Sequence, residues 1–266
     1  MSTTTMPLDS QRIRPERLSP AARAGIFAFG LVAYLAFFVT ICWGIAFVGN
    51  WIVPKTIDSG TPGPIIPSLL INGSILLLFV VQHTIMARPA FKRWWTRIVP
   101  APMERSIFVL LASGILLLLF WQWRPLPTVV WEFTHPVAVY GLSALSVLGW
   151  GIVFLSSFLI NHFDLFGLRQ AWFALRARAY KPVGFRLTFL YRLVRHPLMV
   201  GFLIAFWSTP VMTVGHLFFA IMTTGYILFG THVEERDLIA EHGQAYLDYR
   251  KRVRGLIPLP KRMTNA

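Results

Sequence analysis

The chain has 266 residues, of which 55% are hydrophobic and only 14% are charged, and its formal net charge is +14. This composition excludes an ordinary soluble protein and indicates a chain that lies in a membrane. The positive charge does not indicate nucleic-acid binding, because no recognition motif accompanies it; basic residues that follow a membrane topology and meet anionic headgroups explain it.

Five stretches of the chain lack Asp, Glu, Lys and Arg. A spanning helix needs about 20 mostly apolar residues, so the first four stretches each predict one helix. The fifth holds 38 residues, and Thr209, Pro210 and Gly215 near its middle predict two short helices joined by a turn. The sequence therefore predicts an all-α, polytopic transmembrane bundle of about six spans. The stretches are 24–54, 59–87, 106–123, 133–163 and 196–233.

Basic residues gather at one end of these spans. Of the 25 Lys and Arg residues, 23 lie before the first span, around alternate links or after the last span. Only Lys55 and Arg124 fall in the opposite links. Because cytoplasmic segments carry the Lys and Arg, both termini are predicted to be cytoplasmic. The predicted organisation is a flexible tail (1–22) and a single membrane domain (23–266), in which 24–160 supply the first four spans and 161–266 supply a loop, a helical hairpin and C-terminal helices.

The predicted cytoplasmic segments contain short helices at the membrane surface. Residues 89–105 carry Phe91, Trp94 and Trp95, which are typical of an aromatic belt. Residues 185–194 predict an interfacial helix. A charged helix continues the last span from Val233, and Gly243 is expected to end or kink it. Residues 244–253 predict another short helix, and Pro258 and Pro260 follow it.

Ionisable residues cluster at the predicted cytoplasmic ends of the spans. Arg195, His196 and Pro197 precede the fifth span, where backbone N–H groups of a helix start can face an anion. Glu234 and Glu235 follow the sixth span, and adjacent acids on a helix point to different sides. Ionisable residues beside a bilayer are costly to dehydrate, so their convergence predicts a site. The residues placed at this one depth are His83, His162, Asp164, Arg195, His196, His232, Glu234 and Glu235.

Each of these features also has an ordinary structural explanation. Arg195 and His196 can be an arginine and a histidine that extend to the interface, and the two glutamates can start a solvated helix. The chain has no His-Glu-x-x-His motif and no paired cysteines, so no metal site is predicted. A haem held between membrane histidines, or a partner-binding protein without enzymatic activity, stays open as an alternative.

The order of motifs in the last third resembles that of the isoprenylcysteine carboxyl methyltransferases. Arg195-His196-Pro197 is followed by Glu234-Glu235, by Gly-x-x-Tyr-x-x-Tyr from Gly243, and by a terminal Ile-Pro. The upstream segments 82–89, 104–106 and 162–170 are similar to a narrower bacterial group, the methanethiol S-methyltransferases, which form dimethyl sulfide. Leu198 stands where the carboxyl methyltransferases usually have tyrosine, which disfavours a prenylated protein substrate.

The resemblance implies a multi-pass enzyme of the bacterial inner membrane that uses S-adenosylmethionine, releases S-adenosylhomocysteine and methylates a small volatile thiol. It places the cofactor in the C-terminal region, 161–266. The residues it assigns to the pocket are Arg195, His196, Pro197, Gly201, His232, Glu234 and Glu235, and those that would close it from the tail are Tyr246, Tyr249 and Arg250. A related methyltransferase acting on a prenylcysteine carboxylate, a lipid amine or another thiol stays open.

Methylation of a thiol requires removal of the thiol proton. A cysteine thiol has a pKa of about 8.5, so little thiolate exists near neutrality, and a positioned base would accelerate the reaction. The candidate bases are His83, His162 and Asp164. Tyr191 and Arg195 are candidates for stabilising the thiolate or a bridging water.

Overall fold

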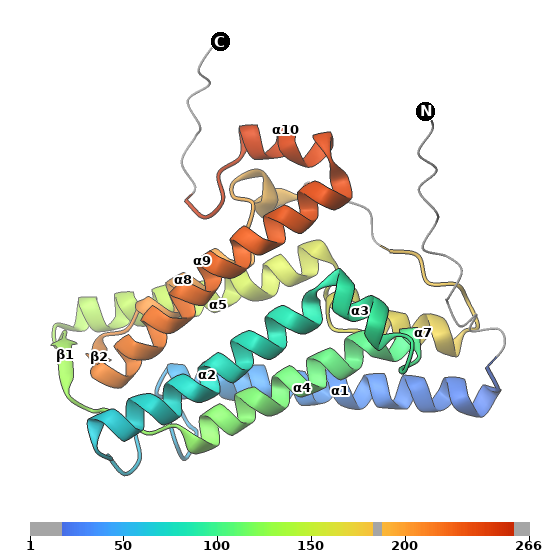
Figure 1. Ribbon diagram of the computed structural model, residues 1–266. Coiled ribbons are helices and arrows are strands. Elements are labelled where there is room, and N and C mark those ends of the chain that lie inside the picture. The colour runs from blue at the N-terminus through green and yellow to red at the C-terminus, as the bar shows by residue number, and fades with distance from the viewer. Residues whose placement is uncertain (1–17, 183–187, 258–266) are drawn as a thin grey trace.

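The computed structural model describes residues 18–182 and 188–257, and in this part of the chain nearly all regular structure is helical. Five helices are long and apolar enough to cross a bilayer, which confirms the predicted all-α, multi-pass bundle (Figure 1). Residues 1–17 of the predicted tail, Pro258 and Pro260 lie outside the described residues. The five helices are α1 (Pro20–Val48), α2 (Ile65–Ala87), α4 (Ala101–Gln122), α5 (Pro136–Ile160) and α9 (Val214–His242).

Local sequence explains where these helices begin. Pro20 and Pro136 occupy the first positions of α1 and α5, where the missing N–H of proline costs nothing. The Ser19 side chain accepts a hydrogen bond from the Ala22 backbone N–H at 3.2 Å and so caps α1. α4 begins five residues before the uncharged stretch, and therefore includes Glu104 and Arg105.

The last hydrophobic stretch forms two helices, as predicted, but the expectation of two short helices was wrong. α8 (Pro197–Trp207) has 11 residues, whereas α9 has 29. At 1.5 Å per residue α8 covers only about 16 Å, roughly half of the hydrocarbon thickness of about 30 Å. An unpredicted antiparallel strand pair, β1 (Val129–Glu132) with β2 (Val211–Thr213), completes the connection.

Side chains satisfy the backbone where α8 stops short. The His216 ring nitrogen Nε2 donates to the Phe206 carbonyl at 2.9 Å, and Ser146 donates to the Ala205 carbonyl at 3.0 Å. Trp131 donates to the carbonyl of Thr209 at 3.3 Å. Unsatisfied carbonyls at membrane depth are costly, so these donors allow the chain to leave the helix. His216 therefore has a structural role, because it stabilises the end of α8.

The helices pack in two groups that meet at the end of the bundle carrying β1 and β2, which we call the outer end (Figure 1). α5 packs on α8, and α1 packs on α4 and on the short helix α7 (Leu168–Leu175); α2 packs on α4. The largest buried cluster joins both groups; among its members are Phe47, Leu119, Trp123, Trp150, Phe206 and Phe219. Only 17–39% of the most apolar stretch of each long helix is buried, so most residues in these stretches keep some surface that lipid can contact.

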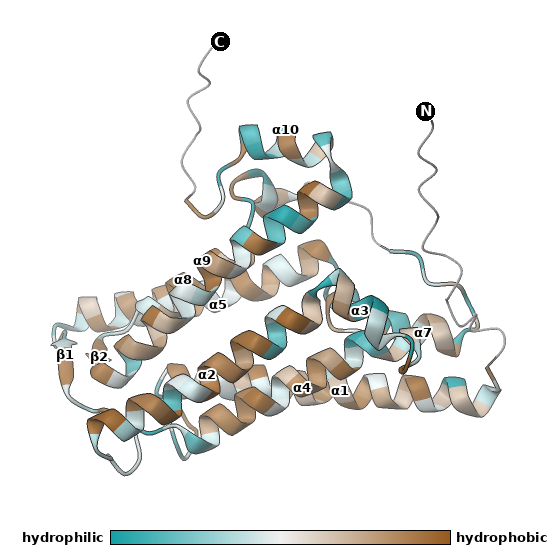
Figure 2. Ribbon diagram, in the orientation of Figure 1, coloured by the Kyte–Doolittle hydropathy of each residue, from teal (hydrophilic) through white to brown (hydrophobic). Residues whose placement is uncertain are grey.

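The opposite, inner end carries the polar elements. Here lie α3 (Pro89–Trp95), α6 (His162–Leu165), the 3-10 turn η2 (Phe189–Arg192) and α10 (Gln244–Arg252). α10 and the adjoining part of α9 are largely hydrophilic in Figure 2, whereas the lower helices are mostly apolar. Gly243, with φ of 55°, ends α9 as predicted, and α10 confirms the helix predicted at 244–253. Of the helix predicted at 185–194, residues 185–187 lie outside the described residues, and the rest forms only η2.

Candidate active site

The site is built where the start of α8 meets the C-terminal segment. His196 immediately precedes α8, and Pro197 occupies the first position of that helix. The backbone N–H groups of Arg195 and His196 donate to the carbonyls of Arg254 and Gly255 at 2.8 and 3.1 Å. These bonds join the C-terminal tail (residues 253–257) to the start of α8, and they bring together residues about 60 positions apart.

Glu235 on α9 is the centre of a buried ion cluster. It accepts a hydrogen bond from Arg195 Nε at 2.7 Å and from His196 Nε2 at 3.1 Å, and Arg250 Nε lies 3.3 Å from its second oxygen. The side chains of Arg195 and Glu235 are only 9% and 13% exposed. Arg195 also donates to the carbonyl oxygen of Val253. Because buried charges are stable only when paired and hydrogen-bonded, these contacts fix the geometry of the cluster.

His196 lies between the two adjacent glutamates. Its Nε2 faces Glu235, and its Nδ1 lies 3.5 Å from Glu234 Oε2. Only the doubly protonated imidazolium can donate from both ring nitrogens. Burial opposes the charged form, but the hydrogen bonds and charges of Glu234 and Glu235 outweigh it, so the pKa of His196 is raised. The sequence-based expectation that the adjacent acids point to different sides agrees with this geometry.

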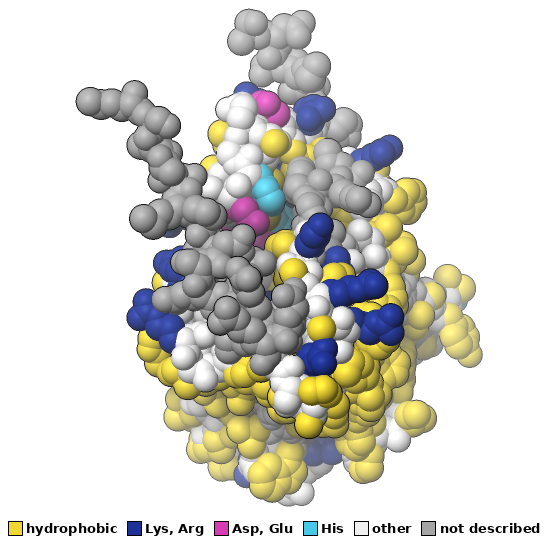
Figure 3. Space-filling model, turned by 90° about the vertical axis from the view of Figure 1, so that its right-hand side faces the viewer, with side chains coloured by type: hydrophobic (Ala, Val, Ile, Leu, Met, Phe, Trp, Pro, Cys, Tyr) yellow, Lys and Arg dark blue, Asp and Glu magenta, His cyan; other side chains and the backbone are white. Residues whose placement is uncertain are grey.

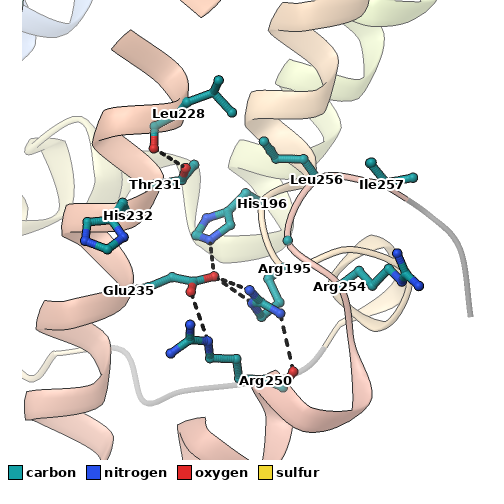
Figure 4. A pocket seen from close by; sticks show the side chains of 11 residues that line it. Arg195, His196, Leu228, Thr231, His232, Glu235, Arg250, Arg254, Leu256 and Ile257 are labelled. Atoms are coloured by element: carbon teal, nitrogen blue, oxygen red, sulfur yellow. Dashed lines mark hydrogen bonds and ion pairs between the residues drawn. The ribbon is translucent and has the colours of Figure 1, made fainter. Parts of the chain in front are cut away.

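A cavity of about 480 Å³ opens beside this cluster (Figure 4). Its volume lies in the range of sites for small molecules and cofactors, roughly 300–1,000 Å³. The wall combines charged groups with aliphatic side chains. Of the predicted cofactor residues, Arg195, His196, His232, Glu235 and Arg250 line it. The other lining residues are Leu228, Thr231, Arg254, Gly255, Leu256 and Ile257.

Two predicted tyrosines anchor α10 over the site. Tyr246 and Tyr249 are 1% and 3% exposed, and the Tyr249 hydroxyl donates to the Tyr191 carbonyl at 2.5 Å. Burial, with the charge of Glu235, raises the pKa of Tyr246 to about 12. Burial also raises the pKa of Tyr191, and the charge of Glu234 adds to this effect. These phenols therefore stay neutral near pH 7 and can donate hydrogen bonds.

The Glu234 side chain projects from a different side of α9 than that of Glu235. Its side chain is 50% exposed, although Nδ1 of His196 is its close neighbour. In the view of Figure 3, acidic and histidine side chains lie in a recess, with Lys and Arg side chains around it and an apolar surface below. Glu234 is therefore much more exposed than Glu235, whose side chain is 13% exposed.

His83 lies in α2 within an aromatic cluster. Its ring centroid is 5.2 Å from that of Phe79, 4.8 Å from Phe108 and 6.3 Å from Tyr226. Its Nδ1 is buried and has no hydrogen-bond partner among the described residues. Buried polar atoms usually have a hydrogen-bond partner, so we regard this nitrogen as a candidate for contact with a bound molecule.

His162 and Asp164 lie in a different cluster, formed with α1 and α7. Ser157 donates to a carbonyl, so its oxygen accepts from His162 Nδ1 at 2.8 Å, while Tyr34 donates to Nε2 at 3.0 Å. Both ring nitrogens are thus used, and burial lowers the pKa of His162. Asp164 is paired with Arg169 at 3.0 Å and accepts from Tyr180 at 2.8 Å. The expectation that all eight ionisable residues converge on one site therefore does not match this arrangement, because His162 and Asp164 lie in a cluster of their own.

Two further predicted pocket residues lie in the helix packing. Pro197 is buried at the start of α8. Gly201 faces Gly149 of α5, and a Cβ on Gly201 would lie 2.7 Å from the Gly149 carbonyl oxygen. Gly201 therefore lets α8 approach α5 closely, and neither residue lines the cavity described above.

The sequence interpretation missed several lining residues. Leu228 and Thr231 precede His232 and Glu235 by one helical turn each, so the i, i+4 rule could have identified them. Arg254 and Leu256 belong to the tail, whose position against α8 depends on the long-range backbone pairing. No local pattern carries that information.

Comparison with known proteins gives close relatives over most of the chain. Methanethiol S-methyltransferase 2 of Bradyrhizobium diazoefficiens is 53% identical over 237 residues, which cover 89% of this chain and 91% of the relative. Methanethiol S-methyltransferase of Mycobacterium tuberculosis is 52% identical over 236 residues, covering 89% and 97%. The protein of that name from Pseudomonas deceptionensis is 47% identical over 265 residues, covering 98% of both chains. No family model and no solved structure matches this chain.

Proposed function

The chain belongs to the methanethiol S-methyltransferase family, as its motifs predicted, and we propose that it transfers a methyl group from S-adenosylmethionine to methanethiol and forms dimethyl sulfide. The protein is a multi-pass membrane methyltransferase. We place it in the bacterial inner membrane with the inner end toward the cytoplasm. The observation that carries the proposal is the buried Arg195–His196–Glu235 cluster beside the cavity, in a chain of this family.

The residues present fit the proposed donor. S-adenosylmethionine carries a carboxylate, an amine, ribose hydroxyls and an adenine ring. Arg254 lines the cavity, and its buried Nε has no hydrogen-bond partner among the described residues, so it can receive the carboxylate. Glu235 and Glu234 can accept from the amine or ribose hydroxyls. Leu228, Leu256 and Ile257 offer apolar contacts for adenine. When bound, the donor supplies an electrophilic methyl group.

The chain's own residues hold the groups beside this cavity in a fixed arrangement. Arg195 holds Glu235 in one orientation, and His196 links it to Glu234. The pairing leaves the cluster close to electrical balance beside the aliphatic side chains of the cavity wall. A thiolate and a sulfonium lose charge as they react, so a weakly polar site favours their reaction over their separate hydration.

The geometry ranks the candidate bases. The two nitrogens of His162 already have partners, and Asp164 is held by Arg169 and Tyr180. Those contacts suit residues that position the loop between α5 and α7. His83 has an unpaired nitrogen among apolar rings, so we assign the base role to His83. Tyr191 and Arg195 keep the role proposed from the sequence, which is to stabilise the thiolate. Tyr191 would do so through its neutral phenol, and Arg195 through its largely buried positive charge.

The direct test is a product assay with purified protein in lipid nanodiscs. Protein supplied with S-adenosylmethionine and methanethiol is expected to release dimethyl sulfide into the headspace, measured by gas chromatography, because both substrates reach the inner end. Methylation of a prenylcysteine carboxylate or a lipid amine with no dimethyl sulfide would contradict the substrate assignment. A Soret-absorbing preparation without methyl transfer would support the haem alternative.

A further inference from the structure

A second cavity, of about 350 Å³, lies at the inner end, where α7 packs beside α1 (Figure 1). Four of its six lining residues are apolar, and three of those are aromatic. The two polar ones already bond to Asp164: the Asn161 side chain accepts from its backbone N–H at 3.2 Å, and Arg169 pairs with its carboxylate at 3.0 Å. Because a buried water needs about two to four polar partners, this wall favours an apolar occupant. The lining residues are Phe27, Asn161, Phe163, Leu168, Arg169 and Trp172.

The aromatic wall of this cavity reaches the protein surface. The rings of Phe27 and Trp172 meet edge to face, with their centroids 5.7 Å apart. Trp172 is 46% exposed, and Phe163 is 47% exposed. Phe27 belongs to α1, which is long and apolar enough to cross the bilayer, and tryptophan is typical of the boundary between bilayer and water. The cavity is therefore at a level where lipid can reach its wall.

Two arginines lie one helical turn from the contact between Phe27 and Trp172. Arg23 precedes Phe27 by four residues on α1, so it lies on the same face of that helix and nearer the inner end. Its Nε is buried and has no hydrogen-bond partner among the described residues. Arg176 follows Trp172 by four residues, and its guanidinium carbon lies 5.6 Å from the centre of the Trp172 ring. Neither arginine forms an ion pair with a described residue, so an anionic group bound here would have two positive charges beside it.

We propose that this cavity binds an anionic phospholipid of the adjoining leaflet, with an acyl chain against Phe27, Phe163 and Trp172 and the phosphate beside Arg23 and Arg176. We call these five residues the lipid site. The apolar wall suits the chain, and the two charges suit the headgroup, since Lys and Arg near a membrane surface attract anionic lipids. A soluble anion lacks the chain that such a wall would bind. The inference does not depend on the methyl-transfer reaction.

Formation of the lipid site requires α7 to be packed on α1. This packing is close, because a Cβ on Gly30 would lie 2.7 Å from the Cβ of Ala171. The wall made by Phe27 and Trp172 thus combines segments that are far apart in the chain. A ligand that binds only the folded state raises its stability. Bound phospholipid is therefore expected to raise the Tm of the protein.

The test measures phospholipid binding to the purified full-length protein in detergent by native mass spectrometry. Phosphatidylglycerol is compared with phosphatidylcholine that carries the same acyl chains. We expect phosphatidylglycerol to bind at least about fivefold more tightly, which is the effect of one cation near the membrane surface. Glycerol phosphate, which has the anionic group without the chains, should not displace it.

Two exposed arginines test the charged part of the lipid site. Arg176→Gln should weaken phosphatidylglycerol binding about fivefold and reduce the preference over phosphatidylcholine. Arg178→Gln changes an exposed arginine two residues further along the chain, and it should bind both lipids like wild type.

Two exposed tryptophans test the apolar part. Trp172→Ala removes part of the aromatic wall and should weaken binding of both lipids by about fivefold to tenfold. Phosphatidylglycerol should then raise the Tm of wild type, measured by differential scanning fluorimetry, more than that of this variant. Trp94→Ala is the matched control, because Trp94 is 50% exposed on α3 and also meets a phenylalanine ring edge to face, that of Phe91 at 5.4 Å.

The contrary results are distinct. Equal affinity for the two lipids, or displacement by glycerol phosphate, would overturn the anionic phospholipid as the occupant. Wild-type affinity in either Arg176→Gln or Trp172→Ala would overturn the location. Formation of dimethyl sulfide is measured separately, so loss of the lipid site leaves the proposed function standing, and failure of the proposed function leaves the lipid site standing.

Discussion

His196 carries the clearest protonation signal at the scale of single residues. Two carboxylates face its two ring nitrogens, and its pKa is raised above the ordinary value of 6.5, because these interactions outweigh the effect of burial. A raised folded-state pKa contributes stability that is fully present below pH 6.5 and is lost as pH rises through the raised value. The histidine therefore couples the stability of the inner end to pH.

We expect this coupling to appear in thermal unfolding. The Tm of wild type should exceed that of His196→Gln by more at pH 6 than at pH 9, because glutamine cannot acquire the charge that the glutamates stabilise. Differential scanning fluorimetry in detergent at both pH values measures the difference. A Tm gap that stays constant with pH would show that the charged imidazole does not stabilise the fold.

Residue positions also mark the limit of the sequence interpretation. The motifs assigned Arg195, His196 and Glu235 to one pocket, and in the structure these three side chains are in contact. Hydropathy located His83, His162 and Asp164 by depth alone, and depth says nothing about which helices face one another. The partners of His162 and Asp164 come from α1 and α7, whereas those of His83 come from α4 and α9.

At the scale of elements, the close contact of α5 and α8 depends on two glycines. A Cβ on Gly149 would lie 2.6 Å from the Ala205 backbone nitrogen and 2.7 Å from the Gly201 carbonyl oxygen. Small residues let membrane helices approach closely. Since α8 begins at the ion cluster, this contact also positions His196.

Gly149→Ala should therefore destabilise the protein by about 1–3 kcal/mol through overpacking, with a lower Tm and weaker activity. Gly151→Ala is the control in the same helix, because a Cβ there meets nothing within 4 Å. It should leave the Tm unchanged or raise it slightly, since alanine favours the helix. Equal Tm values for the two variants would argue against the close packing of α5 and α8.

The unequal lengths of α8 and α9 could not be predicted from hydropathy. The uncharged stretch and its turn residues gave two helices, but the end of α8 at Trp207 depends on hydrogen bonds from Ser146 and His216 and on the pairing of β2 with β1. Those bonds join segments far apart in sequence. A window of local hydropathy contains none of these donors.

At the scale of the whole molecule, the fold combines an apolar outer end with a charged inner end. The large aromatic core binds the two helix groups at the outer end, while the ion cluster, the tail and α10 build the site at the inner end. The uncharged stretches predict the helical bundle, and the positions of Lys and Arg predict which end is charged. The attachment of the tail does not, because it depends on the backbone bonds of residues 195 and 196.

The affinity for S-adenosylhomocysteine, measured by isothermal titration calorimetry, tests the central claim that the inner-end cavity holds the methyl donor. Arg254→Gln removes a charged group that lines the cavity, and Arg252→Gln changes an exposed arginine two residues away. Loss of one charged hydrogen bond costs about 1.5–3 kcal/mol, so Arg254→Gln should weaken binding about tenfold to 100-fold. Arg252→Gln should bind like wild type. Unchanged affinity in Arg254→Gln, or no binding to the wild-type protein, would contradict the account.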